Sequence, residues 1–159
     1  MKTICILLTL AALTACEVKL KPSSDNVDAF SETTLAGKIA GGDWVFVSGR
    51  AKPSHSTSGN YYFDFWNVHQ DQPCQTFGAD VDRKVLGSLP LVPGIYTIGS
   101  EASMTFSILS EGSTSVLVIT SGKIQIDEVT ETEVRGKLLA EFDGDNRING
   151  LFTINLCSE

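Results

Sequence analysis

Residues 115–142 read SVLVITSGKIQIDEVTETEVRGKLLAEF, and the patterning of this stretch decides the fold class. After residue 122 apolar and polar side chains alternate, which places Ile124 and Ile126 on one side of an extended strand. Residues 116–119 are apolar without alternation, which predicts a strand covered on both faces. Ser121 and Gly122 have the composition of a two-residue turn that closes a hairpin. The stretch therefore predicts consecutive antiparallel strands.

The same kind of patterning extends over most of the chain. Further strands are expected at residues 44–47, 60–68, 94–99, 105–109, 134–142 and 151–156, and a turn at 143–149. No segment has convincing helical periodicity. We expect an all-β domain, an antiparallel β-sandwich of about eight to ten strands, with a closed up-and-down β-barrel as the alternative. The widest irregular stretches are expected at 69–90 and 52–59, and such loops commonly carry binding sites.

The composition is that of one globular domain with an acidic balance. The chain has 159 residues, of which 42% are hydrophobic and 19% charged, and a formal net charge of −7. This length is typical of a single domain with its own core. Nucleic acid is disfavoured as a partner, because phosphate binding requires clustered Lys and Arg.

The N-terminal segment has the organisation of an export signal. Lys2 precedes an uncharged run at residues 4–15. A membrane-spanning helix needs roughly 20 apolar residues, so the shorter run fits the hydrophobic region of a cleaved signal peptide. The run ends in Leu13-Thr14-Ala15-Cys16, an aliphatic residue, two small residues and a cysteine. This motif resembles the lipobox of bacterial lipoproteins.

The resemblance to bacterial lipoproteins implies how the mature chain is organised. Residues 1–15 would be removed as a signal peptide, and Cys16 would carry acyl chains such as palmitate that anchor it to a membrane. Glu17 is not the Asp that tends to retain such proteins in the inner membrane of enteric bacteria, so the outer membrane is favoured. Which side of the membrane the domain faces stays open. Residues 16–34 are expected to be a tether, and residues 35–159 a single β domain.

Two further patterns have a weak resemblance to uncharacterised β-sandwich lipoproteins of the bacterial envelope. One is GKIAGGDWVF at residues 37–46. The other is the last part of the chain, with Gly122-x-Ile124-x-Ile126, then Val134-x-Gly136-x-Leu138, then Gly150-x-Phe152 and Cys157. Both consist of residue types common in any strand. This resemblance implies a fold and carries no activity with it.

The cysteine count predicts one disulfide bond. Of the four cysteines, Cys5 would leave with the signal peptide and Cys16 would carry lipid. Cys74 and Cys157 remain, and an exported protein matures in an oxidising compartment, so we expect these two to pair.

Residues 60–68, NYYFDFWNV, contain the most distinctive aromatic cluster of the sequence. Alternation places Tyr62 and Trp66 on the face opposite Phe63 and Phe65. Strands favour aromatic residues, so both faces belonging to the core is the first interpretation. The alternative is that Tyr62 and Trp66 are displayed beside the loops, with His69, as a partner surface.

Candidate catalytic and metal-binding patterns are sparse. Neither His55 nor His69 belongs to an HExxH motif, and the chain has no GxSxG motif. Asp143 begins a segment that superficially resembles a calcium loop, but it lacks the ligand spacing and fits a hairpin turn. Asp80 and Asp82 offer two carboxylates on one side of an extended segment, and we interpret them as a solvated face. The sequence indicates no cofactor and no metal site.

The sequence therefore favours a lipid-anchored cell-envelope protein with a non-catalytic binding or structural role. One alternative is a small envelope hydrolase that uses His69 and loop carboxylates. Another is an inhibitor or a small-ligand carrier, for which an interior cavity would be expected.

Overall fold

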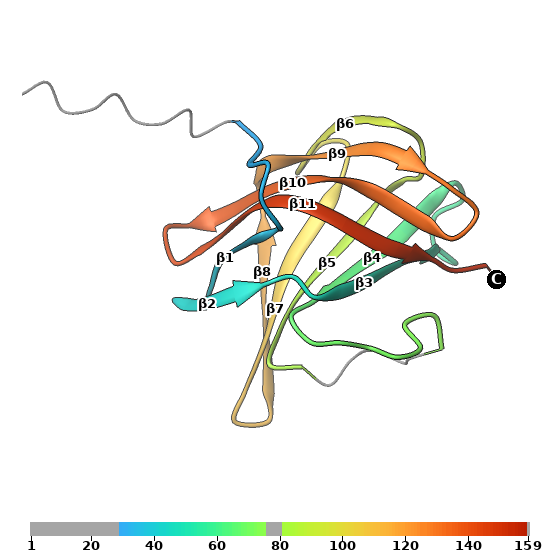
Figure 1. Ribbon diagram of the computed structural model, residues 1–159. Helices are drawn as coiled ribbons and strands as arrows, with labels where there is room; N and C mark the ends of the chain where they lie inside the picture. Colours follow the sequence, from blue (N-terminus) through green and yellow to red (C-terminus); the bar gives the residue numbers. More distant parts are fainter. Residues whose placement is uncertain (1–28, 76–80, 159) are drawn as a thin grey trace, which may run out of the picture.

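The computed structural model describes residues 29–75 and 81–158 (Figure 1). Eleven strands occur in these ranges, and no helix. They are β1 (Ala36–Ile39), β2 (Gly42–Val45), β3 (Ser48–Pro53), β4 (Asn60–Trp66), β5 (Arg83–Pro90), β6 (Gly94–Thr97), β7 (Ser103–Ser110), β8 (Ser113–Ile119), β9 (Ser121–Val129), β10 (Glu133–Asp143) and β11 (Asn146–Leu156). The all-β class predicted from the patterning is confirmed.

The strands form one curled, open sheet, a half-barrel (Figure 1). The strand order is β6-β9-β10-β11-β3-β4-β5-β7-β8, and β1 and β2 extend the sheet from β11. All pairings are antiparallel except that of β11 with β3, which is parallel and short. The sheet is therefore mixed, and the prediction of an entirely antiparallel sheet is wrong. The finer expectation, a sandwich or a closed barrel, is not confirmed.

Alternation along the strands fills the inner side of the curl with one hydrophobic core. Phe63 and Phe65 of β4 are fully buried there. The Phe65 ring lies 5.1 Å from that of Phe152 and 6.0 Å from that of Phe46, both edge-on. Complete burial of one such side chain contributes about 1.5–3 kcal/mol, so this aromatic cluster joins β4 firmly to β11.

The expected hairpin turn at Ser121-Gly122 is wrong. Both residues belong to β9, and β8 and β9 do not pair. Gly122 lies opposite Ala140 with a φ of +132°, and a Cβ atom there would collide with the Leu139 carbonyl. The glycine thus allows two backbones to approach closely, a second common reason for glycine in a strand. Thr120 is the single residue between β8 and β9. At this corner the chain passes from β8, which pairs with β7, to β9, which pairs with β6 and β10.

The expectation that residues 116–119 are covered on both faces is also wrong. Val116 and Val118 are 54% and 60% exposed, whereas Ile119 is buried. β8 pairs only with β7, so it is an edge strand of the half-barrel. An apolar run without alternation indicates double coverage only where a second layer exists, and none of the described residues supplies one here.

Two irregular segments are shorter than predicted. Residues 83–90, expected to lie in a loop, form β5 between β4 and β7. The turn expected at 143–149 is confined to Gly144 and Asp145, because β11 already begins at Asn146. The Asp143 carboxylate accepts hydrogen bonds from the Asp145 backbone N–H and the Asn146 side chain. These bonds stabilise a tight reversal and explain the Asp- and Asn-rich composition.

The expected tether at 16–34 lies only partly within the described ranges, and its last residues contact the domain. Leu151 donates its N–H to Thr33 at 2.8 Å, and the Lys137 ammonium lies 2.6 Å from the Glu32 carboxylate. These contacts attach residues 32–33 to β10 and β11. The signal peptide, Leu13-Thr14-Ala15 and Cys16 lie outside the described residues.

Candidate functional site

The outer face of β3, β4, β5 and β7 carries a hollow of about 340 Å³. Strand register explains its composition, because two cross-strand rows run through it. Lys52, Tyr62, Ser88 and Ser103 form one row, and Arg50, Asp64, Leu86 and Thr105 form the next. Phe63, Gly87 and Met104 complete the lining. Side chains far apart in the sequence thus share one surface because their strands pair in this register.

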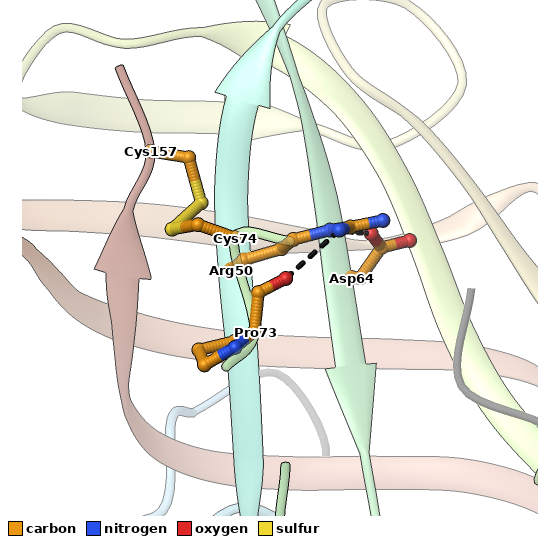
Figure 2. The surroundings of a disulfide bond; sticks show 5 residues. All are labelled: Arg50, Asp64, Pro73, Cys74 and Cys157. Carbon is orange, nitrogen blue, oxygen red and sulfur yellow. Dashed lines mark hydrogen bonds and ion pairs between the residues drawn. A yellow bond between two sulfur atoms is a disulfide. The ribbon is translucent and has the colours of Figure 1, made fainter. Parts of the chain in front are cut away.

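A buried ion pair forms one side of the hollow. The Arg50 Nε lies 2.6 Å from the Asp64 Oδ2, and both side chains are largely buried (Figure 2). The Arg50 Nη1 also donates to the Pro73 carbonyl at 2.8 Å. The guanidinium lies 5.4 Å from the centroid of the Trp66 ring. Arg50 is held from several sides, so it acts as a structural element of the hollow and not as a free cation.

The Cys74–Cys157 disulfide holds the segment after β4 against this face. Figure 2 shows the bond beside Arg50, with the Pro73 carbonyl directed at the guanidinium. The Cys157 N–H donates to the Ala51 carbonyl at 2.8 Å, which attaches the end of β11 to β3. The pairing predicted from the cysteine count is confirmed. The disulfide holds residues 73–74 at the position where the Pro73 carbonyl accepts a hydrogen bond from Arg50.

Tyr62 is the aromatic residue that lines the hollow. Its hydroxyl lies 2.5 Å from the Ser56 hydroxyl, on the segment that connects β3 with β4. Hydrogen bonds from Ser54 and Ser56, aided by the positive charge of Lys52, lower the pKa of Tyr62. The half-buried ring therefore presents an apolar face with a polarised hydroxyl at its edge, a combination typical of ligand-binding surfaces.

The alternative interpretation, a partner surface of Tyr62, Trp66 and His69, fails for Trp66, for which the first interpretation of a core residue is confirmed. Trp66 is fully buried, packed near Val81 and under Arg50. Alternation places it correctly on the outer face, but Arg50 and Val81 cover it. His69 is well exposed and lies 3.1 Å from the exposed Asp71 carboxylate. It is not among the residues that line the hollow, so of the three only Tyr62 contributes to it.

The remaining candidates are not brought together. His55 is exposed near the disulfide, and Asp82 is exposed directly before β5. Asp80 lies outside the described residues. Within residues 29–75 and 81–158, no three His, Cys, Asp or Glu side chains gather closely enough to hold a metal ion. The lining instead combines hydroxyl groups, one tyrosine, one lysine and the neutralised Arg50–Asp64 pair. Such a set can bind and orient a molecule by hydrogen bonds and apolar contact.

Sequence reasoning missed most of the lining. Leu86, Ser88, Ser103 and Thr105 are ordinary strand residues with no local motif. Alternation in β5 and β7 predicts that these side chains point outward. Only the strand order shows that they share one surface.

No family model, curated protein or solved structure matches this chain. The part of the chain that the structure describes contains no helix that is long and apolar enough to cross a membrane.

Proposed function

We propose that this protein is a lipid-anchored component of the bacterial cell envelope that binds a ligand without catalysis. The lipobox-like Leu13-Thr14-Ala15-Cys16 supports the anchor and the outer membrane as the favoured location. The hollow on the outer face of β3, β4, β5 and β7 supports the binding role. The hollow is the single observation that carries the binding role.

The hollow is built for binding in three respects. Its volume of about 340 Å³ lies near the lower end of the range for small-molecule sites. Its floor consists of paired strands, and the disulfide and the Arg50–Asp64 pair hold its border, so little conformational freedom is lost on binding. Arg50, Lys52 and Asp64 leave one excess positive charge in a chain of net charge −7. A ligand with an apolar surface, hydrogen-bonding groups and an anionic group suits this lining.

The alternatives receive less support. A hydrolase based on His69 would need a nucleophile and a substrate cleft at that histidine, whereas the hollow is lined by other residues. A carrier would hold its ligand inside the half-barrel, and there the core side chains pack against each other. A non-catalytic site on the outer face accounts best for the arrangement.

The anchor and the binding site call for separate measurements. Replacement Cys16→Ser should abolish incorporation of an alkyne fatty acid and release the protein from membranes. Labelling that persists in the variant would contradict the anchor.

The binding site is tested by photo-crosslinking in the native envelope. A photoreactive phenylalanine analogue at Ser103, in the hollow, should form adducts. The same analogue at Thr153, exposed on β11, should form none. Tyr62→Ala should remove the Ser103 adducts. Equal adduct yields at the two positions would contradict the hollow as the binding site.

A further inference from the structure

The sheet has three open edges among the described residues, and only one of them is unprotected. β2 and β6 pair on one side only, but each has four residues. Asp43 is exposed on β2, and Pro93 directly precedes β6. Short length, charge and proline are common devices that prevent an edge from pairing with another chain. β8 has seven residues and none of these devices.

β8 is also regular and accessible. Its pairing with β7 has no register shift from Ser110↔Ser113 to Met104↔Ile119, so no bulge bends the edge away. The hairpin of β7 and β8 extends beyond the rest of the sheet (Figure 1). Val116 and Val118 are 54% and 60% exposed on its outer face. A long, straight edge with exposed β-branched residues is a template for another strand.

The backbone of β8 offers alternate groups to such a strand. Glu111 and Gly112 form a two-residue turn, which makes Ser110↔Ser113 the first hydrogen-bonded pair. In an antiparallel hairpin the N–H groups then alternate between the partner strand and the free side. The N–H groups of Thr114, Val116 and Val118 therefore point away from β7.

Charge favours a second copy of the chain as the partner. Between Ala102 and Gly122 the only charged residue is Glu111, although the whole chain carries a net charge of −7. Two copies of an acidic protein repel each other, and least where each presents a neutral surface. A second β8 is such a surface. We propose that β8 pairs antiparallel with β8 of a second copy across a two-fold axis and forms a dimer.

The symmetry of this pairing is self-consistent. Outer-face residues lie opposite outer-face residues in antiparallel strands, and two of the possible registers place Val116 opposite Val116 or Val118 of the second copy. Each arrangement buries valine against valine, a favourable cross-strand pair. An isologous contact uses both β8 edges at once, and the protected β2 and β6 edges do not extend it. The product is therefore a closed dimer and not a fibre.

Cysteine crosslinking of the full chain tests the pairing. Val116→Cys, alone or mixed with Val118→Cys chains, should give a disulfide-linked dimer when cell extracts are oxidised with copper phenanthroline. Val92→Cys is the matched control, because Val92 is 57% exposed but lies outside β8. The wild type reports the background from its own cysteines. A dimer yield no higher than that of Val92→Cys, or adducts with other proteins in place of a dimer, would overturn the proposal.

A second substitution tests whether the β8 backbone makes the contact. In the cysteine variants, Thr114→Pro removes one outward N–H without touching the hydrogen bonds to β7, and should reduce the crosslinked dimer about tenfold. Thr114→Val keeps that N–H and should leave the yield unchanged. Circular dichroism and the urea midpoint of both variants report intact folding. An unchanged yield in Thr114→Pro would assign the contact to another surface and overturn the proposal.

Discussion

The β10–β11 pair and the β7–β8 hairpin are both antiparallel pairs joined by a two-residue turn. They differ in length, in charge and in the number of neighbouring strands. β10 and β11 have 11 residues each, and further strands pair with both of them. Their outer faces carry ion pairs such as Arg147–Glu141 and Lys137–Glu32. β7 and β8 carry no charge, and β8 has an open edge.

This difference shows that local pairing does not decide what a strand presents to its surroundings. Where neighbours surround a strand pair, charged residues on the outer face keep it solvated. Where a neighbour is missing, the same arrangement leaves hydrogen-bonding groups and valines available. The β10–β11 pair therefore stabilises the domain, whereas the β7–β8 hairpin is suited to contact another molecule.

Removal of the disulfide should have the largest effect, because it joins the end of β11 to the other half of the sheet. The β11–β3 pairing that it reinforces involves only Asn155↔Arg50 and Leu156↔Ala51. The double variant Cys74→Ser/Cys157→Ser should lower the free energy of unfolding by about 3–4 kcal/mol, measured by urea denaturation. Wild type treated with dithiothreitol should unfold like the double variant. A loss below about 1 kcal/mol would show that the two halves hold together without the bond.

Two glycine substitutions compare the strand pairs directly. A Cβ at Gly136 of β10 would lie 2.8 Å from the Phe152 ring and collide with the Gln125 carbonyl. Gly136→Ala should therefore cost about 2–3 kcal/mol of unfolding free energy. At Gly112, between β7 and β8, no atom lies within 4 Å, but φ is +78°. Gly112→Ala should cost only about 1 kcal/mol, from backbone strain. Equal costs in urea denaturation would contradict the difference in packing.

The smallest effect should come from the surface ion pair of Lys137 and Glu32. A hydrogen bond to the Glu32 carboxylate raises the pKa of Lys137 above its ordinary value of 10.5. When the folded-state pKa is raised, the ion pair stabilises the protein fully at pH values below the unfolded-state pKa. This stabilisation is lost as the pH rises through the folded-state pKa. Glu32→Gln should thus be slightly less stable than wild type at pH 7, and the difference should diminish as the pH rises past 10.5 and vanish above the raised pKa of Lys137. A difference that persists in thermal denaturation at alkaline pH would point to another cause.

Side-chain patterning predicted some features of the site and missed others for identifiable reasons. Alternation correctly placed Tyr62 and Trp66 on the outer face of β4. It could not show that Arg50 and Val81 cover Trp66, because these two residues belong to parts of the chain outside β4. The Ser-Gly pair at 121–122 is compatible with a turn and with close strand approach. Only the position of β10 distinguishes the two.

The sequence by itself determined the all-β class and the Cys74–Cys157 pairing. Period-two alternation is a property of each strand, and the predicted loss of Cys5 with the predicted lipid on Cys16 leaves Cys74 and Cys157 as the one expected pair. The tertiary structure decided which strands are neighbours, which outer side chains share the hollow and which strand is left at the edge. The physical reason is that alternation specifies the face of a side chain, whereas strand order arises from contacts between segments far apart in the chain. β8 illustrates this, since its apolar run is typical of a central strand, but its place in the sheet makes it an edge.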